Sequence, residues 1–244
     1  MALKVQVHNL FNPTLMEVHD FLTVEETDQL LEDCKKHCDM KRAHVVDMDA
    51  EEQGKQETKL SHQRTNSNAF LSYSDSAIAR EVLKKASVLL QIHWSQAENM
   101  QVVHYGEGEE YQPHKDAFEP NSIRLEPQQT GAIPSSGNVC GNRVATVLLY
   151  LNDVPEGGGT RFPRYGKIIN PQKGKAVIFT NTYIGTQVPD PSSEHGADPV
   201  IKGEKWAVNL WFRNREDTTL NYVEWLKERN KELEKLERSI IYSI

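Results

Sequence analysis

The sequence predicts a mainly β protein with flanking helices, an α+β chain whose core is a β-sandwich or barrel. Several short, apolar, strand-like segments follow one another at even spacing after Met100, and turn residues separate them. Two segments with helical periodicity precede them, and a charged helical segment ends the chain. We therefore expect helices from both ends of the chain to pack on the outside of a β core.

Size and composition indicate a single globular domain spanning residues 1–244. Hydrophobic residues make up 38% of the chain and charged residues 26%, which is typical of soluble proteins. Lys and Arg number 28 against 35 Asp and Glu, so the net charge is −7. No nucleic-acid partner is expected, because that function needs a basic surface. The three cysteines form no framework, and no apolar segment has the length of a signal or membrane span, so we expect a cytoplasmic protein.

Residues 1–99 are expected to form an N-terminal support region of helices and short strands. Loose alternation over residues 5–22 predicts short strands. Thr23 and Glu26 form a capping-box pattern, which predicts a helix that ends near His37.

The rest of this region contains a loop, a strand and a second helix. The polar residues 47–62 are expected to form an exposed loop, and residues 64–71 have strand character. A second helix is predicted over residues 76–92, because apolar residues recur there at helical spacing. These apolar positions are Ile78, Val82, Ala86 and Leu89.

Residues 100–213 are expected to form the β core. The predicted strands are residues 101–105, 144–152, 167–170, 175–179 and 206–212. Residues 117–142 form a long connection rich in Pro, Gly, Ser and Asn, and such connections are often functional. Residues 214–244 predict a charged C-terminal helix that lies on the surface or packs against the core, with a dimer contact as the less favoured alternative. The expected assembly is therefore a monomer or homodimer.

A candidate metal site begins at His114-Lys115-Asp116. In an extended chain, residues i and i+2 point to the same face, so His114 and Asp116 can reach one ion together. His195, just before a run of strand residues, is the best candidate for a third ligand. Two imidazoles and one carboxylate form the facial triad of non-haem Fe(II) oxygenases, which leaves positions open for a 2-oxo acid and O₂.

A second requirement of that chemistry is a cation for the far carboxylate of 2-oxoglutarate. Lys205 lies ten residues after His195, and two short strands joined by a turn would bring its ammonium group into the same barrel. A buried lysine with an anionic partner forms a strong charge-assisted hydrogen bond.

Four ordered segments resemble the catalytic domain of prolyl 4-hydroxylases. They are QVVHYGEGEEYQPHKD, NRVATVLLYLNDVPEGGGTRFP, NPQKGKAVIF and PVIKGEKWAVNLWFR. The segment from Arg64 to Leu71 also resembles the substrate side of that family, and the similarity covers roughly residues 17–213. The resemblance implies a double-stranded β-helix, a distorted jelly roll, in residues 100–213. It also implies an oxidoreductase, a dioxygenase that uses Fe(II), 2-oxoglutarate and O₂, with ascorbate as reductant.

The same resemblance implies roles for individual residues. His114, Asp116 and His195 would be the iron ligands, and Lys205 would bind the distal carboxylate of 2-oxoglutarate. Tyr105 matches a family tyrosine that hydrogen-bonds this co-substrate.

Further candidates share strand faces with these positions or lie beside them. Thr146 and Tyr150 lie on one face of their strand, and either could complete the 2-oxoglutarate pocket. Trp211 matches a position that packs near the iron and co-substrate, and Asn209 shares its face. Two arginines are candidate substrate contacts: Arg64, and Arg161, which is alternatively a loop anchor.

The function expected from these features is 4-hydroxylation of prolyl residues in a peptide or protein, with release of succinate and CO₂. One alternative is a hydroxylase of a free amino acid or another small molecule, which would need a closed pocket rather than an open groove. A second alternative is an oxygen- or iron-sensing or binding module. Retention of all four site residues argues against it. The acidic residues Glu107, Glu109 and Glu110 would favour basic peptides if they lay at the site mouth, but solvated loop charges are the preferred interpretation.

Overall fold

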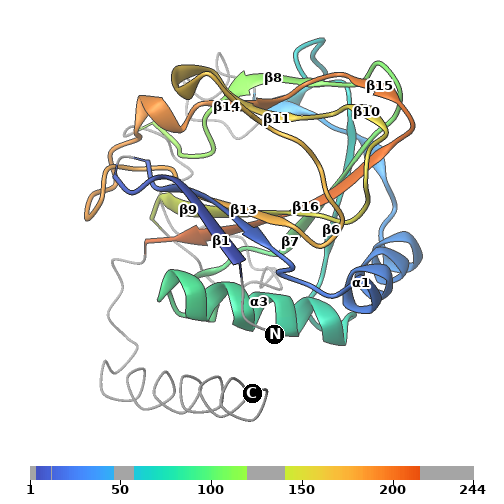
Figure 1. The fold of residues 1–244 in the computed structure, drawn as a ribbon, viewed down its shortest axis with the longest axis horizontal. Helices are drawn as coiled ribbons and strands as arrows, with labels where there is room; N and C mark the ends of the chain where they lie inside the picture. Colours follow the sequence, from blue (N-terminus) through green and yellow to red (C-terminus); the bar gives the residue numbers. More distant parts are fainter. Residues whose placement is uncertain (1–3, 12, 47–57, 120–140, 215–244) are drawn as a thin grey trace.

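The computed structural model describes residues 4–11, 13–46, 58–119 and 141–214. Within these residues two β-sheets face one another, and two α-helices cover the outer face of the larger sheet (Figure 1). This arrangement confirms the predicted mainly β core with helices outside it. The predicted C-terminal helix lies outside the described residues, as does most of the connection 117–142.

The larger sheet has eight strands in the order β1-β2-β13-β9-β16-β7-β6-β3, and all neighbours are antiparallel. Its strands are β1 (Lys4–Asn9), β2 (Leu15–His19), β3 (Lys41–Arg42), β6 (Ser67–Leu71), β7 (Met100–Tyr105), β9 (Arg143–Tyr150), β13 (Ala176–Thr180) and β16 (Lys205–Arg213). Four of these strands come from the N-terminal region, so that region completes the core sheet as well as supporting it.

The smaller sheet has the order β12-β11-β14-β8 and carries two of the candidate metal ligands. Its strands are β8 (Tyr111–His114), β11 (Thr160–Phe162), β12 (Lys167–Ile169) and β14 (His195–Ala197). Two short ladders flank it: β10 (Glu156–Gly157) with β15 (Val200–Lys202), and β4 (Val45–Val46) with β5 (Thr58–Lys59). Of the segment expected as a loop over residues 47–62, residues 47–57 lie outside the described residues, and the rest contains the short strand β5.

Both α-helices begin directly after a capping residue. Thr23 Oγ1 accepts a hydrogen bond from the Glu26 N–H (3.1 Å), and the Thr23 N–H donates to Glu26 Oε2 (2.9 Å). This confirms the capping box of α1 (Val24–His37). The second helix, α3 (Ala77–Leu90), begins after Ser76, whose side chain accepts from the Ala79 N–H. Short 3₁₀ helices complete the set: η1 (Trp94–Gln96), η3 (Pro163–Tyr165) and η4 (Pro191–Ser193).

Two apolar layers hold the fold together. Strand β9 is buried on both faces. Val147 and Leu149 pack in the cluster between the larger sheet and the helices, while Leu148 and Tyr150 pack in the cluster between the two sheets. Burial on both faces explains the uninterrupted apolar run that the sequence shows here. The larger sheet is thereby fixed against the smaller one, and the site lies between them.

None of the helices in the described ranges is long and apolar enough to cross a bilayer.

Candidate active site

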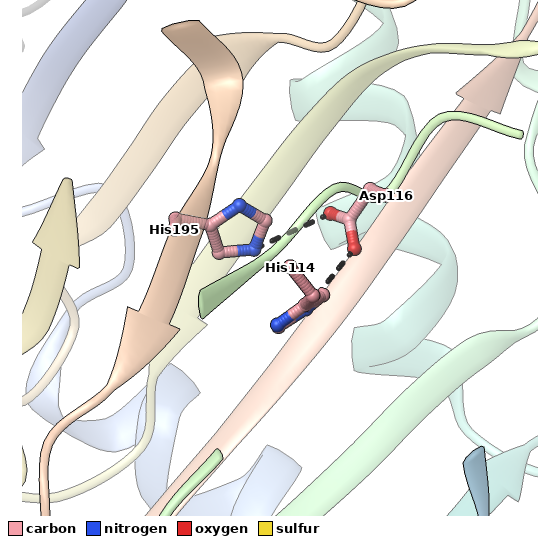
Figure 2. A group of neighbouring side chains, drawn as sticks. All are labelled: His114, Asp116 and His195. Atoms are coloured by element: carbon pink, nitrogen blue, oxygen red, sulfur yellow. Dashed lines mark ion pairs between the residues drawn. The ribbon is translucent and has the colours of Figure 1, made fainter. Parts of the chain in front are cut away.

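Neighbouring strands of the smaller sheet bring the three candidate ligands together. His114 ends β8 and His195 begins β14, and these two residues are directly paired across the antiparallel ladder. Asp116 lies two residues beyond the end of β8, and its carboxylate turns back toward both imidazoles (Figure 2). His114 Nε2 lies 3.6 Å from Asp116 Oδ1, and His195 Nε2 lies 3.7 Å from Asp116 Oδ2. The three ligand atoms all lie within 4.8 Å of one another.

Both imidazoles are oriented in the same way by the backbone. Nδ1 of His114 lies 3.0 Å from the carbonyl oxygen of Gln112, and Nδ1 of His195 lies 3.0 Å from that of Ser193. Because a carbonyl oxygen only accepts, we assign the imidazole proton to Nδ1 in each ring. Each Nε2 therefore directs a lone pair toward the carboxylate, which is how histidine presents itself to a metal.

The electrostatics of this cluster fit a bound cation. Burial lowers the pKa of His195 to about 4, against the attraction of Asp116, so its ring is neutral at physiological pH. Burial also favours the neutral form of Asp116, but the positive charges that His195 and His114 carry when protonated, together with that of Arg143, keep the pKa of this carboxyl well below its usual value. Imidazole lone pairs and an ionised carboxylate then face one another, an arrangement that a divalent ion would satisfy. The donor set of two imidazoles and one carboxylate suits Fe(II).

A buried hydrogen-bond chain holds the carboxylate in place. The hydroxyl of Thr146, a β9 residue, donates to Asp116 Oδ2 at 2.7 Å. The side-chain amide of Asn181 donates in turn to Thr146 Oγ1 at 2.8 Å. Thr146 and Asn181 are completely buried. Such outer partners fix the direction of a ligand and tune the metal site.

Lys205 is a buried cation at the start of β16. Only 2% of the residue is exposed, and its ammonium donates to the carbonyl oxygen of Gly158 at 2.8 Å. Its Nζ lies 5.2 Å from the Tyr105 ring centre and 5.5 Å from that of Tyr150. Burial lowers the pKa of Lys205 to about 7, although Asp198 attracts the charged form. No carboxylate bonds the ammonium among the described residues, so it can receive an anionic ligand.

The Gly158 carbonyl can accept this hydrogen bond from Lys205 because residue 158 is a glycine. Gly158 has a φ of +67°, a conformation that residues with a Cβ rarely adopt. A Cβ there would also lie 3.3 Å from Val200 and 3.4 Å from Val154. The Gly-rich turn predicted from the sequence thus anchors the cation.

A cavity of about 1030 Å³ connects these features. Its inner part contains the three ligands and Lys205, and its outer part reaches exposed side chains of β3 and β6, such as Arg42 and Phe70. Of the other candidates, Tyr105, Asn209, Trp211 and Arg64 also line it. The cavity therefore extends from a polar interior to the surface.

Three candidates do not line the cavity. Thr146 faces Asp116 instead, as described above. The Tyr150 hydroxyl donates to Thr160 Oγ1 at 2.7 Å, beneath the cavity wall. Arg161 is exposed and pairs with Asp198 at 2.8 Å, a contact that fits the loop-anchoring alternative.

The sequence interpretation missed a buried ion cluster beside the site. Both carboxylate oxygens of Glu98 accept from Arg143 at 2.7 Å, and Arg213 also donates to Oε1 at 2.6 Å. The Arg143 guanidinium lies 3.5 Å above the Trp211 ring, and it lines the cavity. Despite burial, the two arginines lower the pKa of Glu98 to about 2. No local pattern pointed to this cluster, because 45 residues separate Glu98 from Arg143.

A stack of side chains continues the wall from the metal ligands outward. The Tyr111 ring lies parallel to that of His114, with 3.6 Å between ring centres. The guanidinium carbon of Arg64 lies 4.6 Å from the centre of the same Tyr111 ring. Arg64 is thus fixed at the cavity wall near the triad, where the sequence placed a substrate contact.

Comparisons with known proteins show which family the chain resembles. Residues 100–213 match the family described as the 2OG-Fe(II) oxygenase superfamily. Probable prolyl 4-hydroxylase 10 of Arabidopsis thaliana is 35% identical over 225 residues, which cover 84% of this chain and 71% of the relative. Prolyl 4-hydroxylase subunit alpha-1 of Gallus gallus is 34% identical over 83% of this chain, but the match covers only 36% of that relative.

Solved structures show the same fold. The viral collagen prolyl hydroxylase of Paramecium bursaria Chlorella virus-1, in complex with 2-oxoglutarate, has a TM-score of 0.60 at 21% identity, covering 82% of this chain and 96% of that one. A Pseudomonas putida prolyl-4-hydroxylase has a TM-score of 0.51 at 18% identity, covering 82% and 92%. These likenesses confirm the expected double-stranded β-helix.

Fold and site together define a dioxygenase that depends on Fe(II) and 2-oxoglutarate. Within that class, the chain belongs to the prolyl 4-hydroxylase family.

Proposed function

We propose that this protein 4-hydroxylates prolyl residues within a peptide or protein, using Fe(II), 2-oxoglutarate and O₂. The observation that carries the proposal is the continuous cavity of about 1030 Å³ from the buried His114–Asp116–His195 cluster to the surface. A chain segment can lie in such a groove with one residue at the metal. A free amino acid would need a smaller, enclosed pocket, so the peptide interpretation is favoured over the small-molecule alternative.

The triad residues would hold the metal, and Thr146 with Asn181 would keep the Asp116 carboxylate directed at it. Bound Fe(II) with 2-oxoglutarate supplies the activation of O₂ that inserts one oxygen atom into a C–H bond, with succinate and CO₂ as co-products.

Lys205 would bind the distal carboxylate of 2-oxoglutarate. Its ammonium is buried, and the neutral Tyr105 and Tyr150 rings surround it. In this dry setting a charge-assisted hydrogen bond is strong. Tyr105 pairs directly with Lys205 across β7 and β16, so the two residues can bind the same co-substrate.

Tyr111, Trp211 and Arg64 would contact the peptide. They surround the cavity between the triad and the surface. Aromatic side chains offer flat apolar surfaces suited to a prolyl ring. Asn209 is held by Gln101 at 3.2 Å and would complete the inner wall.

The remaining proposals concern the setting of the enzyme. We propose a single catalytic domain that works as a monomer or homodimer in the cytoplasm, with a protein or peptide as its partner rather than a nucleic acid or a membrane. Sedimentation of the purified protein tests the proposed monomer or homodimer. A sedimentation coefficient above that of a dimer would contradict this oligomeric state.

The proposal is tested by incubating the protein with Fe(II), 2-oxoglutarate and ascorbate over a panel of proline-rich peptides, free proline and no substrate. Succinate and hydroxyproline are measured together. His114→Ala removes a ligand, and His37→Ala, at the exposed end of α1, is the matched control.

We expect at least one peptide to yield hydroxyproline with the wild type and His37→Ala, and none with His114→Ala. Hydroxylation of free proline alone would move the assignment to a small-molecule hydroxylase. Metal binding without product formation from any substrate would support the sensing or binding-module alternative.

A further inference from the structure

We propose that the peptide bound by this site is acidic, carrying Asp or Glu side chains beside the target proline. This inference rests on the proposed peptide hydroxylation and names its substrate class. It follows from the charge of the cavity wall, which is opposite in sign to that of the whole chain.

The described residues that line the cavity are predominantly cationic. Six are Lys or Arg, and two are Asp or Glu. The cations are Lys41, Arg42, Arg64, Lys115, Arg143 and Lys205, and the anions are Asp116 and Glu119. The chain as a whole has a net charge of −7, so the described part of the cavity wall has the opposite sign.

The inner charges already have functions. Asp116 belongs to the candidate metal cluster, Arg143 is paired with Glu98, and Lys205 is assigned to 2-oxoglutarate. Among the described residues, the mouth then keeps four cations against one carboxylate, that of Glu119. Glu119 contacts Lys115 and neutralises it in part.

Arg64 and Arg42 have no carboxylate partner in the described ranges. Arg64 donates Nε to Asn66 Oδ1 (3.0 Å) and Nη1 to the carbonyl of His44 (3.2 Å), and its remaining donors have no acceptor there. Its guanidinium carbon also lies 4.6 Å from the centre of the Tyr111 ring, and these contacts together orient the group. Among the described residues, Arg42 makes one long bond, 3.5 Å, to the carbonyl of Ser61. A planar, preoriented guanidinium with free donors matches a carboxylate.

Lys41 adds a third available charge. Its partner Asp39 lies 3.0 Å away, but both side chains are largely exposed, at 77% and 83%. Exposed pairs of this kind are weak and exchange readily with other charges. Lys41 and Arg42 form β3, which pairs with β6 beside the strand that carries Tyr105, so these cations are fixed relative to the site.

The acidic residues that would have favoured a basic peptide are used elsewhere. The Glu107 carboxylate accepts from the Gly203 N–H at 2.9 Å, and that of Glu109 accepts from the Gly106 N–H at 2.8 Å. The Glu110 carboxylate accepts from the side chain of Gln112 at 2.7 Å. None of the three lines the cavity, so they do not oppose an acidic substrate.

The test uses three proline-rich peptides of equal length that differ only in the residues beside the prolines: Asp, Ala or Lys. We measure kcat/KM from hydroxyproline formation, and we measure binding of the labelled peptides by fluorescence anisotropy, at low and high salt. We expect kcat/KM and affinity to be highest for the Asp peptide, intermediate for the Ala peptide and lowest for the Lys peptide. The Asp and Lys peptides should differ by roughly tenfold or more at low salt, because charge complementarity raises the rate of encounter and the specificity. The spread should shrink at ~0.5 M salt, where surface charges are screened.

Charge-reversal variants test whether the preference for the Asp peptide originates at the cavity. Arg42→Glu should reduce the preference for the Asp peptide by about threefold or more, and Lys41→Glu should act in the same direction. Arg164→Glu, an exposed charge reversal in η3 away from the cavity, is the matched control and should leave the preference unchanged.

Equal kcat/KM values and equal binding for the three peptides would overturn the inference while leaving the proposed function intact. Salt-sensitive binding of the Asp peptide without hydroxylation would support the inference and overturn the proposed function. A preference that Arg42→Glu and Arg164→Glu alter equally would also overturn it, because the groove would then not be the origin.

Discussion

Burial and ligand binding shift the pKa of Lys205 in opposite directions. Burial lowers the pKa of the ammonium to about 7 in the free site, against the attraction of Asp198, while the facing Tyr105 and Tyr150 are neutral. A bound dianion stabilises the charged form, so 2-oxoglutarate binding is coupled to protonation of this lysine.

We therefore expect the apparent KM for 2-oxoglutarate to rise as pH increases above about 7, by up to ~tenfold per pH unit, because free Lys205 loses its proton there. The measurement is KM between pH 6 and 9. Lys205→Arg should remove the slope, since its guanidinium stays charged throughout. A wild-type KM that stays constant over this range would contradict the assignment of Lys205.

Thr146 shows how one hydroxyl can affect the metal. It bonds Asp116 Oδ2 at 2.7 Å inside the fold. We expect Thr146→Val to weaken Fe(II) affinity by about 10- to 100-fold, because the carboxylate loses the group that orients it. Calorimetric titration with Mn(II), as a stable substitute for Fe(II), measures this effect.

The conservative variant Thr146→Ser keeps the hydroxyl and should retain most of the affinity. If Val and Ser weakened metal binding equally, packing rather than the hydrogen bond would be responsible.

At the scale of elements, the Glu98 cluster ties together three parts of the larger sheet. Glu98 lies just before β7, Arg143 begins β9 and Arg213 ends β16. The charges are largely buried, so removal of the carboxylate would leave two guanidinium groups without their anion.

We expect Glu98→Gln to destabilise the fold by roughly 3–5 kcal/mol, measured by denaturant unfolding. Glu81→Gln, in an exposed pair with Lys84 on α3, is the matched control and should change stability by less than about 0.5 kcal/mol.

The contribution of Glu98 to the stability of the fold depends on pH. The pKa of Glu98 is about 2 in the folded protein and 4.5 as its ordinary value. Its stabilising contribution is therefore complete above about pH 4.5 and is lost as pH falls toward 2. Glu98→Gln should flatten this part of the stability profile. An unchanged profile, or a destabilisation no larger than that of Glu81→Gln, would show that the cluster contributes little.

At the scale of the whole molecule, the sequence predicted the parts whose signal is local. The capping box at Thr23 and the apolar run of β9 gave helix and strand positions within a few residues. The i, i+2 relation of His114 and Asp116 placed two ligands together. Such features depend on short-range geometry, which composition and periodicity record.

Features that arise from long-range pairing were not predictable in the same way. Strands β8 and β14 have only four and three residues, too few for a clear alternation. The Glu98–Arg143 pair and the cationic groove arise when distant strands come together. The role of Arg161 depends on the direction of its side chain, which pairs with Asp198 and does not line the cavity.

The most direct test of the central claim is the source of the oxygen atom in the product. The acidic proline-rich peptide is incubated with the enzyme, Fe(II), 2-oxoglutarate and ¹⁸O₂, and fragment masses locate the label. We predict one ¹⁸O atom on a prolyl residue and an equal amount of succinate with the wild type, and neither product with His114→Ala. Succinate formed without label in the peptide, under conditions where the peptide is bound, would contradict the account.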